Sequence, residues 1–308
     1  MAGTSKKAVF AILITLALFA CGAPPPPPPP PAQSAPQWAD ALESPDIYAV
    51  IRVQKLKRDA VYGQFWQTLM RVAEARGFTR GASMVEALSG SDEVVIGIAR
   101  GNDALLALRG VPASLDPATI NDGAGHPLFH LVNERTKVPE YELSDRRSAD
   151  ASAGAVFVLP DRTWVGTLGD ARGRARQVFA SPIQRSAPKV DADALLAVRL
   201  SGKLTRMFER HPLYGPLTKK LSTTTFALKP GKQGLVIGFE YADADATAWG
   251  EMQAKRLVAD LVAKDEKRFG WLKEAKVAYE ENTVFVRVAL PPRLLEELPN
   301  ASGSDFGF

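Results

Sequence analysis

Short apolar runs alternate with polar turns along most of the chain and predict β-strands in two similar halves. The segment "YAVIRVQKL" (48–56) recurs as "LAVRLSGKL" (196–204). Each is an apolar strand with one arginine, followed by a lysine-leucine entry into a helical stretch. The pattern then predicts two hairpins in each half, at 94–110 and 155–168 in the first and at 224–240 and 276–290 in the second.

Helical stretches are expected between and after these hairpins. Asp116 and Pro117 suit an N-cap followed by proline at the first helical position. In the second half we expect Asp245 to cap a long helix that ends near Lys267. Its apolar residues fall on one side at helical spacing: Trp249, Met252, Leu257, Val258, Leu261 and Val262. A closing helix is predicted in each half, over 170–179 and 292–298.

The predicted fold class is therefore α+β, with two tandem repeats of β-α-β-β-α-β-β-α. Each repeat is expected to form a mainly antiparallel sheet with helices on one face. The strand and helix order resembles split β-α-β (ferredoxin-like) units, with an extra insert at 126–153 in the first half.

The amino terminus has the layout of an export signal. Lys6 and Lys7 precede an uncharged apolar run over 8–20, which is shorter than the about 20 residues that a membrane span needs. Leu18-Phe19-Ala20-Cys21 resembles the lipobox of bacterial lipoproteins, although Phe19 departs from the usual small or β-branched residue. The alternative, cleavage after Ala23, would place Pro24 directly after the cut.

The lipoprotein resemblance implies that Cys21 carries the lipid and begins the mature chain. Gly22 stands where inner-membrane lipoproteins carry a retention aspartate, so the resemblance implies the outer membrane if the source is Gram-negative. Pro24–Pro31 then predict a polyproline spacer of about 25 Å between lipid and body. A ligand for a proline-recognition domain is the alternative interpretation.

These segments set the expected domain boundaries. They are a signal peptide over 1–20, the lipidated cysteine and stalk over 21–40, a first α+β domain over 41–182, a linker over 183–192, a second α+β domain over 193–300 and a disordered tail over 301–308.

The charge balance and the cysteine content argue against a nucleic-acid partner and against an intramolecular disulfide. Without Lys6 and Lys7 the chain keeps 36 of its 38 basic residues against 34 acidic ones, so no nucleic-acid partner is expected. Cys21 is the single cysteine, so no intramolecular disulfide can form.

Catalytic and metal-binding patterns are sparse. We find no HExxH, GxSxG or phosphate-binding glycine loop, and we predict no cofactor, no metal site and no catalytic residue. His126 and His130 would share one face of a strand, which makes them candidate ligand-binding residues. With His211 they are the three histidines, and a hydrolase that uses one of them as a base is the alternative function.

Arg52 and Arg199 occupy matching places in the two repeated strands. Each is expected to pair with a carboxylate or extend toward solvent, and a groove that holds an anionic ligand is the alternative. We therefore predict a non-enzymatic envelope lipoprotein whose body binds or scaffolds a partner, most simply another envelope protein.

Overall fold

The structure is a computed structural model that describes residues 41–42, 44–75, 82–99, 103–121, 125–133, 138–144, 154–180 and 188–297. The expected signal peptide, Cys21, the stalk and the tail over 301–308 lie outside the described residues, as does Gly101 between the strands of the first predicted hairpin. The chain divides into two compact bodies. Among the described residues, the N-terminal body comprises those up to Lys55 and those from Met70 to Lys189, and the C-terminal body comprises Leu56–Leu69 and those from Val190 onward.

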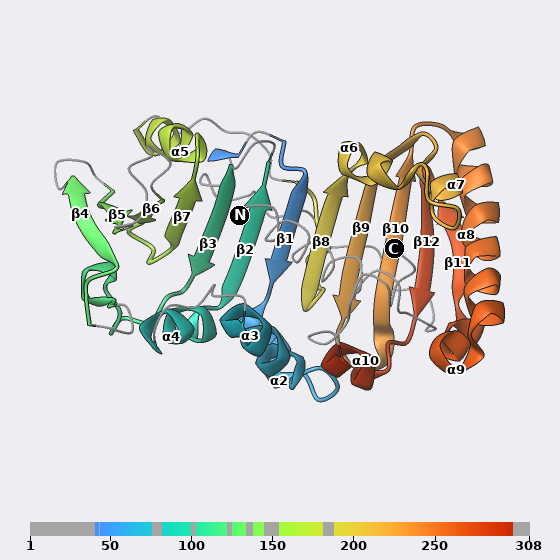
Figure 1. Cartoon of the computed structure of the whole chain (residues 1–308), viewed down its shortest axis with the longest axis horizontal. Helices are drawn as coiled ribbons and strands as arrows, with labels where there is room; N and C mark the ends of the chain where they lie inside the picture. Colours follow the sequence, from blue (N-terminus) through green and yellow to red (C-terminus); the bar gives the residue numbers. More distant parts are fainter. Residues whose placement is uncertain are drawn as a thin grey trace. The chain divides into compact units, whose positions relative to one another are not determined.

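The N-terminal body is built on an antiparallel sheet with the strand order β1-β2-β3-β7-β6-β5-β4 (Figure 1). Its strands are β1 (Ile47–Ile51), β2 (Glu93–Ile98), β3 (Ala104–Arg109), β4 (Phe129–Asn133), β5 (Glu140–Leu143), β6 (Ala155–Val158) and β7 (Trp164–Leu168). Its helices are α4 (Ala82–Gly90), η2 (Pro117–Thr119) and α5 (Ala171–Ala180). Strands β4 and β5 form the insert that the sequence predicts.

The C-terminal body contains an antiparallel sheet with the order β8-β9-β10-β12-β11 (Figure 1). Its strands are β8 (Leu196–Ser201), β9 (Leu221–Lys229), β10 (Gly234–Tyr241), β11 (Lys276–Glu280) and β12 (Thr283–Val288). Its helices and 3-10 turns are α6 (Gly202–Thr205), η3 (Arg206–Phe208), α7 (Gly215–Thr218), η4 (Gly231–Gln233), α8 (Ala244–Lys264), α9 (Glu266–Phe269), η5 (Gly270–Glu274) and α10 (Pro292–Glu297).

Two helices near the amino terminus cross the division between the bodies. They are α2 (Val53–Arg58) and α3 (Phe65–Ala75), and residues 56–69 group with the C-terminal body. Tyr62 is 2% exposed there, and its hydroxyl donates to the carbonyl of Leu290 at 3.1 Å. Asp59 Oδ2 accepts from the N–H of Gly231 at 2.8 Å. An early segment of the chain thus completes the core of the body formed mainly by the last third.

The α+β class and the antiparallel sheets agree with the sequence prediction, but the split arrangement does not. β1 pairs directly with β2, and β8 pairs directly with β9, both antiparallel. In a split β-α-β unit, the two strands joined by the helix run parallel to each other, and an antiparallel strand lies between them. The short helical stretches after β1 and β8 instead return the chain to the neighbouring position, as an antiparallel connection allows.

Two helix predictions also need correction. Asp116 does cap Pro117–Thr119, accepting from the N–H of Ala118 at 2.9 Å, but the element is a single 3-10 turn. The glycine-containing sequence at 123–125 and Pro127 follow at once and oppose a longer helix. In the second half the cap of α8 is Asp243, not Asp245, because its Oδ1 accepts from the N–H of Ala246 at 2.8 Å.

Candidate ligand cavity in the C-terminal body

An apolar cavity of about 120 Å³ lies between α8 and the sheet of the C-terminal body. It is bounded by the inward side of α8, one face of strands β8, β9, β10 and β12, and the short helices α6, η3, α7 and η5. The lining residues are Leu200, Thr205, Phe208, Tyr214, Leu217, Thr218, Leu221, Thr224, Phe226, Ile237, Phe239, Ala254, Leu257, Val258, Leu261, Leu272, Val286 and Val288.

Strand register explains why these side chains converge. Leu200 on β8 pairs with Thr224 on β9, which pairs with Phe239 on β10. Directly paired residues point to the same face of a sheet, so the three form one row across the cavity floor. On α8 the lining positions Ala254, Leu257, Val258 and Leu261 follow helical spacing. The cavity is therefore a consequence of two regular patterns that face each other.

Close packing at one end holds α8 against the sheet. Gly250 of α8 lies so near the ring of Tyr241 that a Cβ at this position would overlap it. The Tyr241 hydroxyl donates to the carbonyl of Leu217 at 3.0 Å, which ties the end of β10 to α7. Burial raises the pKa of Tyr241 above its ordinary value, so this hydroxyl stays a donor across the physiological range.

The outward side of α8 departs from the sequence prediction. Trp249 and Met252 were expected to face the core with Leu257 and Val258, but their exposed fractions are 42% and 52%. The Trp249 ring has its indole N–H donating to the carbonyl of Pro216 at 3.3 Å and the ammonium of Lys219 above it at 5.9 Å. The buried stripe of α8 uses small residues at this level instead, including Ala246 and Gly250.

Polar groups in the cavity are few, and no charged side chain is among its lining residues. Burial raises the pKa of Tyr214 to about 12, so its phenol is neutral. The hydroxyl of Thr205 donates to the carbonyl of Gly202 at 3.0 Å, and that of Thr218 donates to the carbonyl of Gly215 at 2.8 Å. Thr224 differs, because its buried hydroxyl has no hydrogen-bond partner among the described residues. The cavity therefore suits an uncharged apolar group.

The two arginines singled out by the sequence lie elsewhere. Arg52 directly follows β1, and its Nε is 3.7 Å from a carboxylate oxygen of Glu93. Arg199 is on β8, next to the cavity-facing Leu200, so it points to the opposite face of the sheet. Its Nη2 donates to the hydroxyl of Thr223 at 3.2 Å. Their role in holding an anionic ligand stays a prediction.

The three histidines are also dispersed along the chain. His126 is exposed and precedes β4, which begins at Phe129, whereas His130 is exposed within β4. His211 is partly buried beside the cavity-lining Tyr214, with ring centroids 4.6 Å apart. Within the described ranges, no group of three His, Cys, Asp or Glu side chains is arranged to hold a metal ion.

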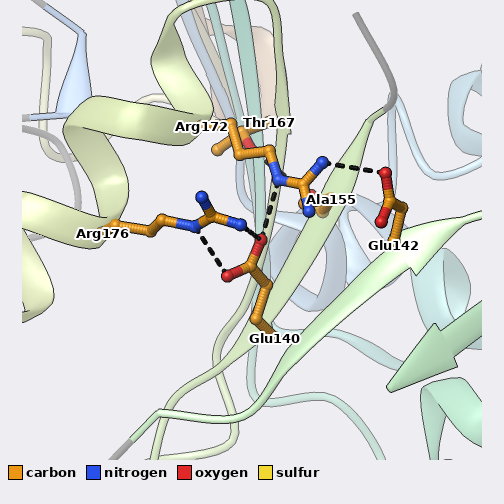
Figure 2. A network of polar contacts seen from close by, with 6 residues as sticks. All are labelled: Glu140, Glu142, Ala155, Thr167, Arg172 and Arg176. Atoms are coloured by element: carbon orange, nitrogen blue, oxygen red, sulfur yellow. Dashed lines mark hydrogen bonds and ion pairs between the residues drawn. The ribbon is translucent and has the colours of Figure 1, made fainter. Parts of the chain in front are cut away.

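A polar cluster in the N-terminal body has a structural explanation. Glu140 on β5 accepts two hydrogen bonds from Arg176 and one from Arg172, both on α5, at 2.7 to 2.8 Å (Figure 2). Arg172 also donates to Glu142 at 3.0 Å. Burial by itself raises the pKa of Glu140, but the hydrogen bonds and charges of Arg176 and Arg172 outweigh it and hold that pKa below its ordinary value. The two carboxylates and the two guanidinium groups neutralise one another, and their hydrogen bonds attach α5 to β5 of the sheet.

Among the residues that the structure describes, no helix combines the length and the apolar composition that a bilayer span requires. Cys21, the predicted lipid site, lies outside these residues.

Comparison with known proteins yields a match of fold. No known protein family matches the chain, and no curated protein matches it by sequence. Crystal form I of TP0453 superposes with a TM-score of 0.53 at 11% identity, covering 87% of this chain and 98% of that one. Crystal form III gives the same TM-score and identity and covers 99% of TP0453. At such identity the likeness shows that the two chains share an α+β fold.

Sequence reasoning did not find the cavity. Its residues are the leucines, valines and phenylalanines that also fill an ordinary core. The one signal available was Thr224, a polar residue at an inward position of β9 between Leu221 and Phe226. In a run of three threonines, this residue was indistinguishable from a strand former.

Proposed function

We propose that the protein is an envelope lipoprotein, exported and anchored by lipid at Cys21, whose body binds an apolar ligand in the cavity beneath α8. The observation that carries the binding function is the cavity itself, whose volume is about 120 Å³ and whose lining holds no charge. Apolar cavities of about 150 Å³ bind molecules such as benzene. A cavity of this size and chemistry therefore supports binding of an aliphatic or small aromatic group.

The lipobox resemblance supports the location. An export signal followed by Cys21 and a proline run would hold the body about 25 Å from a bilayer, where apolar ligands are plentiful. Two or three acyl chains would anchor the protein firmly, since each buried CH₂ contributes about 0.8 kcal/mol. A further protein of the envelope, expected from the sequence, would then be the donor or acceptor of the ligand.

We also propose that the two halves arose by duplication. Each contains a first strand, short helices, a hairpin, a second hairpin and a closing helix, in that order. In the second half a cavity-covering helix of 21 residues, α8, follows the first hairpin, whereas the helical element described at that place in the first half is the 3-10 turn Pro117–Thr119. This difference supports specialisation of the second half for ligand binding.

A cavity-filling variant tests the binding function. Ala254 is 2% exposed and faces the cavity, so Ala254→Leu should fill much of it. In a calorimetric titration with benzene as the probe, we expect the variant to lose affinity about tenfold or more. Ala259→Leu is the matched control, because Ala259 is an exposed position of the same helix. Absence of probe binding by the unmodified protein, or equal binding by Ala254→Leu, would contradict the proposal.

A cysteine variant tests the anchor separately. Cys21→Ala should leave the protein unprocessed or release it from the membrane fraction. Labelling with a radioactive fatty acid should mark the unmodified protein and not the variant. A Cys21→Ala protein that is processed normally and stays membrane-bound would rule out lipidation at this residue.

A further inference from the structure

We infer that the hydroxyl of Thr224 recognises an oxygen acceptor on the ligand, so that the cavity selects an uncharged aliphatic chain carrying a carbonyl group, such as an ester or a ketone. This inference rests on the proposed binding function and specifies its ligand class.

The argument begins with the burial of an unpaired hydroxyl. Thr224 is 3% exposed, and none of the described residues hydrogen-bonds to its Oγ1. A buried polar atom that lacks a partner destabilises the folded state, because it has given up its hydrogen bonds to water. Valine has almost the same shape and an equally high strand preference, and it would avoid this cost. The hydroxyl is therefore unfavourable for the fold of the protein by itself.

The position of Thr224 directs its side chain into the cavity. It lies in the middle of the row formed with Leu200 and Phe239 on the neighbouring strands. Its chain neighbours Thr223 and Thr225 point to the opposite face and have partners. Thr223 accepts from Arg199, and Thr225 donates to the carbonyl of Gly238 at 3.5 Å.

The other two threonines of the cavity make the contrast specific. Thr205 and Thr218 each donate to a carbonyl three residues earlier in the chain. Their hydroxyls are satisfied within their own helical turns and have no need of a ligand. Thr224 is thus the cavity threonine whose hydroxyl a ligand can satisfy.

The surroundings of Thr224 define the acceptor. The cavity lining holds no charged side chain, so a carboxylate placed there would lack a counter-ion. An ester or ketone oxygen is uncharged and accepts a hydrogen bond from a hydroxyl. The leucine, valine and phenylalanine side chains around it suit the methylene groups on either side of the carbonyl.

Matched small probes test the inference on the full chain. Binding of heptan-2-one and of heptane is measured by titration for the unmodified protein and for Thr224→Val. We expect the valine variant to lose about fivefold in affinity for the ketone while its affinity for heptane is unchanged or improved. Thr224→Ser should keep the ketone preference, and Thr225→Val, which removes a satisfied hydroxyl on the opposite face of β9, should also leave it unchanged.

A spectroscopic measurement on the unmodified protein provides an independent readout. The carbonyl stretch of bound heptan-2-one, labelled with ¹³C, should lie at a lower frequency than in an alkane solvent, as expected for a hydrogen-bonded carbonyl. A bound carbonyl that keeps its alkane-solvent frequency, or a Thr224→Val variant with unchanged affinity for both probes, would overturn the role of Thr224 and leave the cavity function intact. Failure of the unmodified protein to bind either probe would instead count against the proposed function itself.

Discussion

Asp59 and His211 each lie three residues before a tyrosine that is followed by glycine, and each side chain accepts from the same two backbone positions. Asp59 Oδ1 accepts from the N–H groups two and three residues later, both at 2.9 Å. His211 Nδ1 does the same at 3.2 and 3.4 Å. A carboxylate and an imidazole thus perform one local task, which is to fix the turn that carries Tyr62 or Tyr214.

This relationship predicts that an aspartate can take over the role of His211 in its turn. Asp59→Ala should lower the free energy of unfolding by roughly 2 kcal/mol, because three N–H groups, including that of Gly231, lose their acceptor. His211→Ala should cost about 1 kcal/mol, and His211→Asp should restore most of it. Urea denaturation measures all three, and a His211→Asp protein as unstable as His211→Ala would contradict the shared role.

The buried carboxylate Glu140 predicts an acid-dependent loss of stability. Its pKa is held below the ordinary value, so protonation is less favourable in the folded state than in the unfolded one. The contribution is therefore complete above the ordinary pKa of a glutamate and is lost as the pH falls through the lowered value. Glu140→Gln should lose roughly 2 kcal/mol at pH 7 and show a weaker pH dependence between pH 3 and 6.

Glu142→Gln is the control for this measurement. Glu142 contacts only Arg172 within the cluster and is more exposed than Glu140, so its replacement should cost less than 1 kcal/mol. Equal effects of the two variants would show that the cluster is not centred on Glu140.

Ionisation of the buried Tyr62 phenol is predicted to lower the free energy of unfolding at alkaline pH. Burial, followed by the charge of Asp59, raises the pKa of its phenol to about 12. Because the folded state keeps this proton longer than the unfolded chain does, the contribution is complete below about pH 10 and is lost as the pH rises through about 12. Tyr62→Phe should unfold with a free energy about 1 kcal/mol lower at pH 7 and should lack this alkaline component. Absorbance at 295 nm follows the ionisation, and a Tyr62 phenol that titrates near 10 would contradict its burial.

Gly250 predicts a steric effect on the helix over the cavity. In Gly250→Ala the new methyl group would overlap the ring of Tyr241, so α8 or the ring must move. We expect a loss of about 2 kcal/mol or more, although alanine favours helices over glycine. Ala248→Gly, at an exposed position of the same helix, should cost only about 1 kcal/mol. A stabilised Gly250→Ala protein would show that the end of α8 does not pack against Tyr241.

The hairpins were the most predictable part of the fold, for a physical reason. Alternating apolar residues and turn glycines act locally, and β10 and β12 lie where the sequence placed them. Gly231 has a φ of 59° at its turn, a conformation in which glycine is favoured. The N-cap of α8 was predicted two residues too late, at Asp245 instead of Asp243. Both aspartates are acceptable caps in the sequence, and the path of the folded chain decides which one is used.

Long-range features were harder to predict. β1 and β2 are direct neighbours in the sheet. The sequence does not determine this pairing, because a helical connection between two strands permits several strand orders. The exposure of Trp249 depends on Tyr241 occupying the space beneath α8. Whether the Thr224 hydroxyl finds a partner among the described residues depends on all the side chains around the cavity, so the neighbouring sequence does not indicate it.

The grouping of residues 56–69 with the C-terminal body has a consequence for how this protein can be taken apart. A fragment that begins at 190 would carry every strand from β8 onward and still lack the side chains of Asp59 and Tyr62, which its own turn at Gly231 and its own carbonyl at Leu290 require. During translation the 56–69 segment is therefore synthesised long before the rest of its body. Well over a hundred further residues must be added before the residues that it contacts exist. Any dissection into halves needs a circularly permuted or co-expressed 56–69 segment to yield a folded C-terminal unit.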